Sequence, residues 1–361
     1  MRTYFTVLLL AMGVSFLMTP IAARLAFWLG AVDRPEARKI HREPIPRLGG
    51  LAVLAGFCVP WVALYLIDNR VARIFQEQQA LVLTLVGCGC LMFVVGMLDD
   101  VAGLSAARKL VLQVGIAAGM YAGGIRITEV TNPFGEAWAL GWMAGPVTVL
   151  WIVGLTNATN LLDGMDGLVA GVAAVLALSL AMINIIGGNT VVALLTFALA
   201  GATLGFLPYN FSPARIFLGD SGSLLVGLLM AGIGTLSFFK AATATLVLVP
   251  LLLFALPLFD TTQVVIGRMR RGRHPFTADD THVHHRLLRF GLSQKEAAIF
   301  FYAVTVFLGV AAIVLSWRFT RGSFAALGIL GAVLAAVLLA WSWQLRQRRN
   351  PDRPPGTEAT P

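Results

Sequence analysis

ALVLTLVGCGCLMFVVGMLDD, residues 80–100, is an uncharged apolar run that ends in two adjacent aspartates. A helix needs about 20 apolar residues to cross the hydrocarbon core of a bilayer, so this run is long enough to span it. A carboxylate at the centre of a span costs on the order of 2.5 to 3.5 kcal/mol even on the lenient insertion scale. The stretch therefore predicts a transmembrane helix that carries Asp99 and Asp100 at its end for a functional reason.

The same pattern recurs along the 361 residues, of which 58% are hydrophobic and only 12% are charged. Soluble domains carry about 25% charged residues, so the composition excludes an ordinary soluble enzyme. Division at charge clusters and at Gly, Pro and Asn predicts an all-α polytopic membrane protein with about eleven spans. These spans lie near residues 4–28, 48–67, 80–98, 109–124, 144–161, 167–187, 190–208, 217–239, 242–265, 295–316 and 323–343.

The distribution of lysine and arginine predicts the orientation of these spans. Most of the 27 basic residues fall in the segments that follow odd-numbered spans, and a minority fall on the other side: Arg2, Arg70, Arg73, Arg126, Lys240, Arg318 and Arg321. The positive-inside rule then places the N-terminus outside and the C-terminus in the cytoplasm. We expect one membrane-embedded domain, residues 1–345, with cytoplasmic loops near 30–48, 99–108, 156–167, 209–217 and 267–294. Residues 346–361 are expected to form a basic, disordered cytoplasmic tail.

Two local patterns make further structural predictions. The external segment 125–141 alternates and then turns, which predicts a short surface hairpin. Three glycine pairs match the small-xxx-small spacing that allows close helix packing in membranes, although such matches are common in apolar bundles: Gly115 and Gly119, Gly167 and Gly171, and Gly201 and Gly205.

Five aspartates flank the predicted spans: Asp99, Asp100, Asp163, Asp166 and Asp220. Span parity places all five on the cytoplasmic side, so we expect them to converge at one membrane boundary. Mg²⁺ prefers hard oxygen ligands and usually takes one or two carboxylates, with water and substrate phosphate completing its shell. The aspartates therefore predict a metal and phosphate site, with carboxylates to spare for other tasks. A solvated helix end remains the alternative for Asp99 and Asp100.

Two polar segments supply the surroundings of this site. Asp220 lies in FLGDSGS, residues 217–223, where small residues open a helix whose free N–H groups are expected to meet phosphate. Residues 157–167, NATNLLDGMDG, form a polar break between apolar spans. Such a break is stable only where it lines a wet cavity, so a cavity is predicted beside it.

Basic loops supply the complementary charge. The loop before the second span is cationic and stiffened by Pro44 and Pro46, although a positive-inside anchor explains its charge equally well. The loop at 267–294 holds four of the five histidines together with several arginines. Zinc binding lacks a supporting thiol or tetrahedral set, so anion binding is the favoured interpretation.

Taken together, these motifs resemble those of the polyprenyl-phosphate N-acetylhexosamine-1-phosphate transferases, a family that includes the phospho-N-acetylmuramoyl-pentapeptide transferases. The resemblance extends from residue 33 to about residue 291. It implies an eleven-span fold and a Mg²⁺-dependent site on the cytoplasmic face, with Mn²⁺ as a substitute metal.

The resemblance also implies roles for individual residues. Catalytic roles near the reacting phosphates fall to Asp99, Asp100 and Lys109, and the metal-contacting positions are Asp220 and Asn160. The positions implied for substrate binding are Lys39, Asn157, Asp163, Asp166, His282, His284, His285 and Arg286.

The segment DTHVHHRL, residues 280–287, is similar to the version in bacterial enzymes that open O-antigen, common antigen or teichoic acid linkage synthesis. It departs from the muramoyl-pentapeptide branch and favours UDP-GlcNAc or a related N-acetylhexosamine as donor. The implied reaction moves the sugar-1-phosphate to undecaprenyl phosphate in the bacterial cytoplasmic (inner) membrane and releases UMP. The implied partners are the UDP-sugar, the lipid phosphate and the bilayer, without nucleic acid; a homodimer is compatible with the sequence.

An ion-coupled transporter or lipid flippase that uses intramembrane carboxylates is the alternative function. Transporter sites typically lie near the bilayer midplane between structural repeats. The aspartates here lie at span ends on one side, and the sequence shows no matching repeats, which favours the enzyme.

Overall fold

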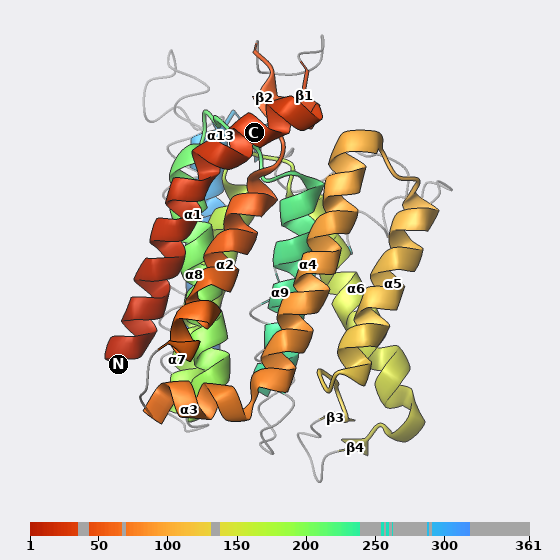
Figure 1. Cartoon of the computed structure of the whole chain (residues 1–361), viewed down its shortest axis with the longest axis vertical. Coiled ribbons are helices and arrows are strands. Elements are labelled where there is room, and N and C mark those ends of the chain that lie inside the picture. The colour runs from red at the N-terminus through yellow and green to blue at the C-terminus, as the bar shows by residue number, and fades with distance from the viewer. Residues whose placement is uncertain are drawn as a thin grey trace, which may run out of the picture.

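The structure is a computed structural model of the chain. It describes residues 1–34, 43–66, 70–130, 138–238, 254, 255, 258, 259, 262, 287, 288 and 291–317. Within these residues the dominant feature is a bundle of long helices that run nearly side by side (Figure 1).

The helices coincide with the predicted spans in the described part of the chain. They are α1 (Arg2–Leu29), α2 (Gly49–Tyr65), α4 (Gln79–Ala102), α5 (Ala106–Ala122), α6 (Ala144–Leu162), α7 (Leu168–Ile186), α8 (Thr190–Asn210), α9 (Gly219–Phe238) and α13 (Gln294–Trp317). Among the described residues, seven helices are long and apolar enough to cross a membrane, or eight if α2 and the bent helix after it form one span. The chain is therefore an all-α, multi-pass membrane protein. The predicted spans near 242–265 and 323–343 lie mostly or wholly outside the described residues, so the count of about eleven stays a prediction.

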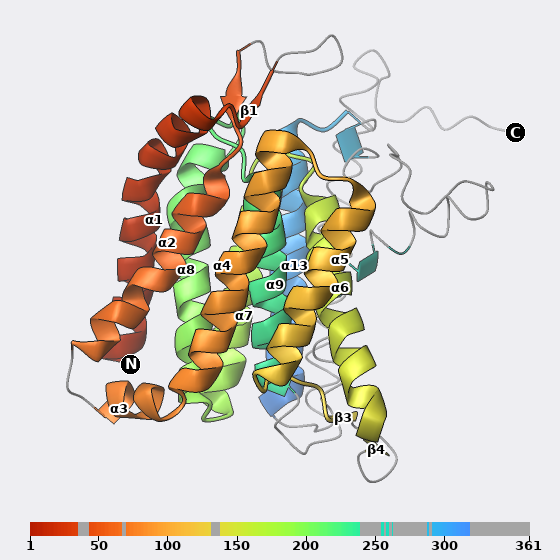
Figure 2. The ribbon, with the colours of Figure 1, turned by 45° about the vertical axis from the view of Figure 1, so that its right-hand side comes forward.

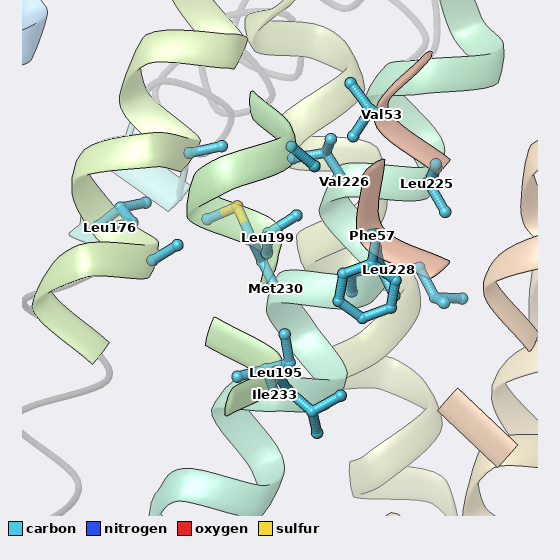
Figure 3. Packing of buried hydrophobic residues seen from close by; sticks show 14 of the residues in the cluster. Val53, Phe57, Leu176, Leu195, Leu199, Leu225, Val226, Leu228, Met230 and Ile233 are labelled. Atoms are coloured by element: carbon cyan, nitrogen blue, oxygen red, sulfur yellow. The ribbon is translucent and has the colours of Figure 1, made fainter. Parts of the chain in front are cut away.

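Helix α9 lies at the centre of the bundle and is almost entirely buried: 94% of the apolar 18-residue stretch that could span the membrane is covered by other parts of the protein. It packs against α4, α6 and α2 and also touches α7 and α8. Figure 3 shows apolar side chains of the buried cluster that α9 forms with neighbouring helices: Val53, Phe57, Leu176, Leu195, Leu199, Leu225, Val226, Leu228, Met230 and Ile233. Because lipid is as apolar as these side chains, close van der Waals packing holds such helices together. This packing fixes the first turn of α9, which carries Asp220.

Close helix packing is confirmed at Gly201 and Gly205 but not at Gly115, where a Cβ atom would meet no atom within 4 Å. A Cβ atom at Gly201 would run into the backbone carbonyl of Leu8, and one at Gly205 would run into that of Met12. Both partners belong to α1, so α8 and α1 approach each other backbone to backbone. Glycine is therefore required at positions 201 and 205 on this face of α8.

The end of the bundle that was predicted to be external carries two small elements. The predicted hairpin is confirmed, because β3 (Glu129–Val130) pairs antiparallel with β4 (Trp138–Ala139), just before the 3₁₀ turn η1 (Gly141–Met143). A short helix, α3 (Arg70–Glu77), was not predicted and lies at 110° to α2. Half of its eight residues are apolar, but it is far too short to cross a membrane, so a division of the sequence into spans does not detect it. Phe75 nevertheless anchors α3 by stacking on Trp61, with ring centroids 5.5 Å apart.

The opposite end carries β1 (Val32–Asp33) and β2 (Ile45–Pro46), which form an antiparallel pair with Asp33 opposite Ile45. Figures 1 and 2 both place this pair where α1 and α4 end. Four of the five aspartates noted above lie at the ends of α4 and α9 or directly after α6, on this same side of the bundle. We refer to it as the site end.

Candidate active site

The centre of the site, which we call the charged centre, is Lys109 held between the carboxylates of Asp99 and Asp220. The turn after α4 is closed by Leu104, whose N–H donates to Asp99 Oδ1 at 2.6 Å, and Ser105 then caps the start of α5. This tight reversal returns Lys109 to the end of α4. Its Nζ donates to Asp99 Oδ2 and to Asp220 Oδ2, each at 2.5 Å. The structure thus brings together three predicted site residues from three helices.

Asp100 has a different task from its neighbour. Its carboxylate is 1% exposed, and it accepts hydrogen bonds from the N–H groups of Asp220 (3.0 Å) and Ser221 (2.9 Å). These N–H groups belong to the first turn of α9, where backbone N–H groups have no acceptor within their own helix. The prediction that they are free to meet phosphate is therefore wrong, because Asp100 already occupies them.

Two predicted amides lie on α6 and face neighbouring helices. Asn160 Nδ2 donates to Ser223 Oγ at 2.8 Å, which places the amide against the first turn of α9, close in sequence to Asp220. Asn157 Nδ2 donates to Gln113 Oε1 at 2.6 Å. Gln113 is fully buried one turn beyond Lys109 on α5, so this pair ties α6 to α5 beside the charged centre.

The polar break after α6 is held from three directions. Gly167, with φ +74°, receives a hydrogen bond on its carbonyl from Tyr302 and donates its N–H to Asn210 Oδ1. Asp166 Oδ2 accepts from the N–H of Ala214 at 3.0 Å. These contacts come from α13, from the end of α8 and from the loop that follows α8. A loop fixed this firmly can present Asp163 and Asp166 in constant positions.

The predicted cavity beside this break is present and has a volume of about 740 Å³. Its charged lining residues are Asp33, Arg47, Asp163, Asp166 and Lys295, and Asn210, Ser212 and Gly219 also belong to its wall. Asp33, Arg47, Asn210 and Lys295 were not among the predicted site residues. Arg47 lies in the basic loop before the second span, and the positive-inside rule already explains the charge of that loop. Nothing else in the sequence distinguished Arg47 from the other basic residues there.

Asp163 lies in the break between α6 and α7, outside the helices that span the membrane. It is half-buried and lines the cavity. Burial and the nearby carboxylates of Asp220 and Asp100 together raise the pKa of Asp163 to about 8, although the Arg47 guanidinium acts in the opposite direction. In the ligand-free protein at neutral pH, this carboxyl therefore holds its proton.

This proton predicts a pH-dependent effect of Asp163→Asn on stability. In the unfolded chain an aspartate ionises near pH 3.9, so the folded protein binds one proton more between about pH 4 and pH 8. Stability consequently falls as the pH rises through this window, and the full penalty applies above about pH 8. Asparagine cannot ionise, so the variant should unfold at least about 2 °C above the wild type at pH 9 and should match it near pH 4.

The measurement is thermal unfolding of ligand-free protein in detergent with a chelator present. Glu129→Gln is the matched control, because Glu129 is exposed in the hairpin and its substitution should leave the midpoint unchanged at both pH values. Equal midpoints for Asp163→Asn and wild type at pH 9 would show that folding does not raise the pKa of Asp163.

The donor set at the charged centre suits a hard divalent cation. Asp220 and Asn160 offer a carboxylate and an amide beside the same helix turn, and the Ser221 hydroxyl is fully buried near Asp100 without a well-aligned hydrogen bond to any described residue. Among the described residues, no group of three or more His, Cys, Asp or Glu side chains is arranged to hold a metal ion by itself. Mg²⁺ does not need a complete set of protein ligands, because it keeps several waters and binds substrate phosphate. The residues present therefore fit Mg²⁺.

Five predicted substrate-binding residues cannot be placed. Lys39, His282, His284, His285 and Arg286 lie outside the described residues, and their roles stay predictions.

Comparison with known proteins places the charged centre within a known family. The profile of glycosyl transferase family 4 matches residues 82–238, which include Asp99, Lys109 and Asp220. A Bacillus subtilis protein named as a probable undecaprenyl-phosphate N-acetylglucosaminyl 1-phosphate transferase is 38% identical over 300 residues, which cover 83% of this chain and 81% of that relative. The chain belongs to glycosyl transferase family 4.

Other relatives of this family 4 member carry names of the same kind. A decaprenyl-phosphate N-acetylglucosaminephosphotransferase of Mycobacterium tuberculosis is 32% identical over 313 residues, 80% of this chain and 76% of the relative. An undecaprenyl-phosphate alpha-N-acetylglucosaminyl 1-phosphate transferase of Yersinia pestis is 29% identical over 308 residues, 81% of this chain and 79% of the relative.

Proposed function

We propose that this family 4 protein transfers N-acetylglucosamine-1-phosphate from UDP-GlcNAc to undecaprenyl phosphate and releases UMP. The names of its relatives support the substrates. The observation that carries the proposal is the meeting of Asp99, Lys109 and Asp220 at the ends of three helices, beside a cavity whose wall carries five charged residues. Such a site can hold a lipid phosphate at the membrane boundary and a nucleotide in the cavity.

The reaction we propose is direct displacement at phosphorus. An oxygen of the lipid phosphate attacks the β-phosphorus of the donor, and the bond from that phosphorus to the bridging oxygen breaks. The bridging oxygen keeps the electron pair and leaves as part of UMP. A phosphate monoester has a second pKa of about 6, so the acceptor is largely anionic near neutral pH and needs no strong base. Catalysis then rests on positioning and on charge stabilisation.

The two adjacent aspartates divide this work. Asp100 uses both carboxylate oxygens to hold the first turn of α9, so it acts as a positioning residue. Asp99 faces Lys109 and is the carboxylate that would orient the acceptor phosphate or take its last proton. Lys109 would bind phosphate oxygens at the point where acceptor and donor meet.

Mg²⁺ held by Asp220 and Asn160 would neutralise the charge of the donor diphosphate. The described residues support this role through their chemistry, as hard oxygen donors on one turn of α9 and on the facing part of α6. Mn²⁺, which favours similar ligands, is the expected substitute.

We further propose that the protein spans the bacterial inner membrane about eleven times, with its N-terminus outside and the site end in the cytoplasm. The excess of basic residues in the loops at the site end supports this orientation. The same placement disfavours a transporter, because the carboxylates lie at helix ends and not midway along the bundle.

Transfer is tested with purified protein in vesicles that contain undecaprenyl phosphate, and with donors labelled in the sugar. We expect a Mg²⁺-dependent lipid-soluble product from UDP-GlcNAc. UDP-GalNAc and UDP-QuiNAc should react at least about tenfold more slowly, because a site built to bind a hydroxyl discriminates against its loss or inversion. Preference for another of these donors would correct the sugar, and failure of all three would contradict the proposed reaction.

A further inference from the structure

Arg47 lies in a segment whose backbone is fixed on two sides. Its N–H donates to the carbonyl of Ala31 (2.9 Å), while the carbonyl of the preceding Pro46 accepts from Phe217 N–H (2.8 Å). Gly49 N–H in turn donates to the carbonyl of Phe217 (3.0 Å). The segment is therefore bound between the end of α1 and the residues that lead into α9, and the position of the Arg47 side chain is restricted.

The Arg47 guanidinium is attracted to two carboxylates without being bound tightly by either. Its nitrogens lie 3.7 Å from Asp33 Oδ1 and 3.9 Å from Asp100 Oδ1. Charge-assisted hydrogen bonds are shorter, about 2.7 to 2.9 Å, so these two contacts are ion pairs without a hydrogen bond. The side chain is 39% exposed and lines the cavity, and a guanidinium carries five N–H donors. Donors are thus presented to whatever fills the cavity.

The charges around the cavity make this placement informative. Among the described lining residues, the acids Asp33, Asp163 and Asp166 outnumber the bases Arg47 and Lys295. An anionic phosphate in this cavity is stabilised only where a base is near. Lys295 is exposed in the first turn of α13, whereas Arg47 lies against Asp100, the residue that holds α9 beside the charged centre. Of the two described basic residues that line the cavity, Arg47 is therefore the one that lies next to the charged centre.

We propose that Arg47 is a catalytic residue that binds the phosphate of the UMP half of the donor and stabilises the charge that this phosphate gains on leaving. The inference rests on the proposed function, in which the bridging oxygen leaves with UMP. The planar guanidinium matches two phosphate oxygens at once, which the ammonium of lysine cannot do. Asp33 and Asp100 would hold the side chain ready until the donor arrives.

The test compares the binding of UMP and of uridine to wild-type protein and to Arg47→Gln by displacement of labelled UDP-GlcNAc. Uridine lacks the phosphate, so its affinity should stay within about twofold of wild type. UMP affinity should fall at least about tenfold, since a lost hydrogen bond to a charged group is worth that much. Turnover should fall at least tenfold as well, and Arg47→Lys should give intermediate losses in both.

Arg215→Gln is the matched control, because Arg215 is exposed on the same end of the protein and does not line the cavity. It should bind UMP as the wild type does. Unchanged UMP affinity in both Arg47 variants would overturn the assignment, and an equal loss of UMP and uridine affinity would show a purely structural role. The proposed function is judged separately, by product formation in the unchanged protein.

Discussion

Asp220→Asn is expected to lower the turnover number for transfer by at least about 10³-fold, the largest effect of any single substitution at the site. Asp220 is the carboxylate that meets Lys109 on the first turn of α9, and it is the candidate Mg²⁺ ligand. Asparagine keeps the shape of the side chain but removes its charge. The variant therefore loses both the metal ligand and one of the two anions that hold Lys109.

A second readout separates this loss from simple unfolding. Wild-type protein should unfold at a higher temperature when Mg²⁺ and UDP-GlcNAc are added together, because ligands that bind only the folded state stabilise it. Asp220→Asn should show little of this rise while it keeps a cooperative transition without ligand. Glu77→Gln, which removes one exposed acid in α3 at the opposite end, should behave as the wild type. Normal Mg²⁺-dependent turnover in Asp220→Asn would exclude Asp220 as the metal ligand.

Gly96→Ala is expected to damage the site without touching a charged group. A Cβ atom at Gly96 would overlap the carbonyl of Asp220 and the Cα of Ser221, both of which are backbone atoms that cannot rotate away. Helices α4 and α9 must then separate at the point where Asp100 caps α9. Overpacking of this kind costs about 1 to 3 kcal/mol of stability. Displacement of catalytic groups by about 1 Å can lower the rate about 10²-fold. We therefore expect the turnover number to fall about 10²-fold in protein that is still folded.

The control for this substitution lies on the same helix. A Cβ atom at Gly87 would meet no atom within 4 Å, and alanine favours a helix more than glycine does. Gly87→Ala should therefore keep full activity and an equal or higher unfolding temperature. If Gly96→Ala were as active as Gly87→Ala, close contact between α4 and α9 would not be needed for the site.

The long helices were predictable because a bilayer imposes simple rules on them. The apolar run near 4–28 became α1 (Arg2–Leu29), and the run near 144–161 became α6 (Ala144–Leu162). Membrane thickness fixes the length of such runs, and polar residues mark their ends. Helix α3 escaped prediction because it lies across the bundle end, where Phe75 and not span length decides its fold.

The site could be predicted as a set of residues but not as an arrangement. Successive residues of an α-helix point about 100° apart, so Asp99 and Asp100 must face different neighbours. The sequence does not tell which helix lies on which side. In the structure Asp99 faces α5 and Asp100 faces α9, which separates a reacting carboxylate from a positioning one. Arg47 was missed for a similar reason, because contacts with residues 217 and 218, distant in the sequence, determine its position.

The central claim is that the protein moves a sugar together with its phosphate. Its most direct test uses UDP-GlcNAc labelled with ³²P in the β-phosphate and with ³H in the sugar, in vesicles that contain undecaprenyl phosphate. We predict that both labels enter the lipid in equal amounts, that unlabelled UMP is released, and that neither occurs with Asp220→Asn. Entry of ³H alone, with ³²P retained in released UDP, would contradict phosphosugar transfer by this protein.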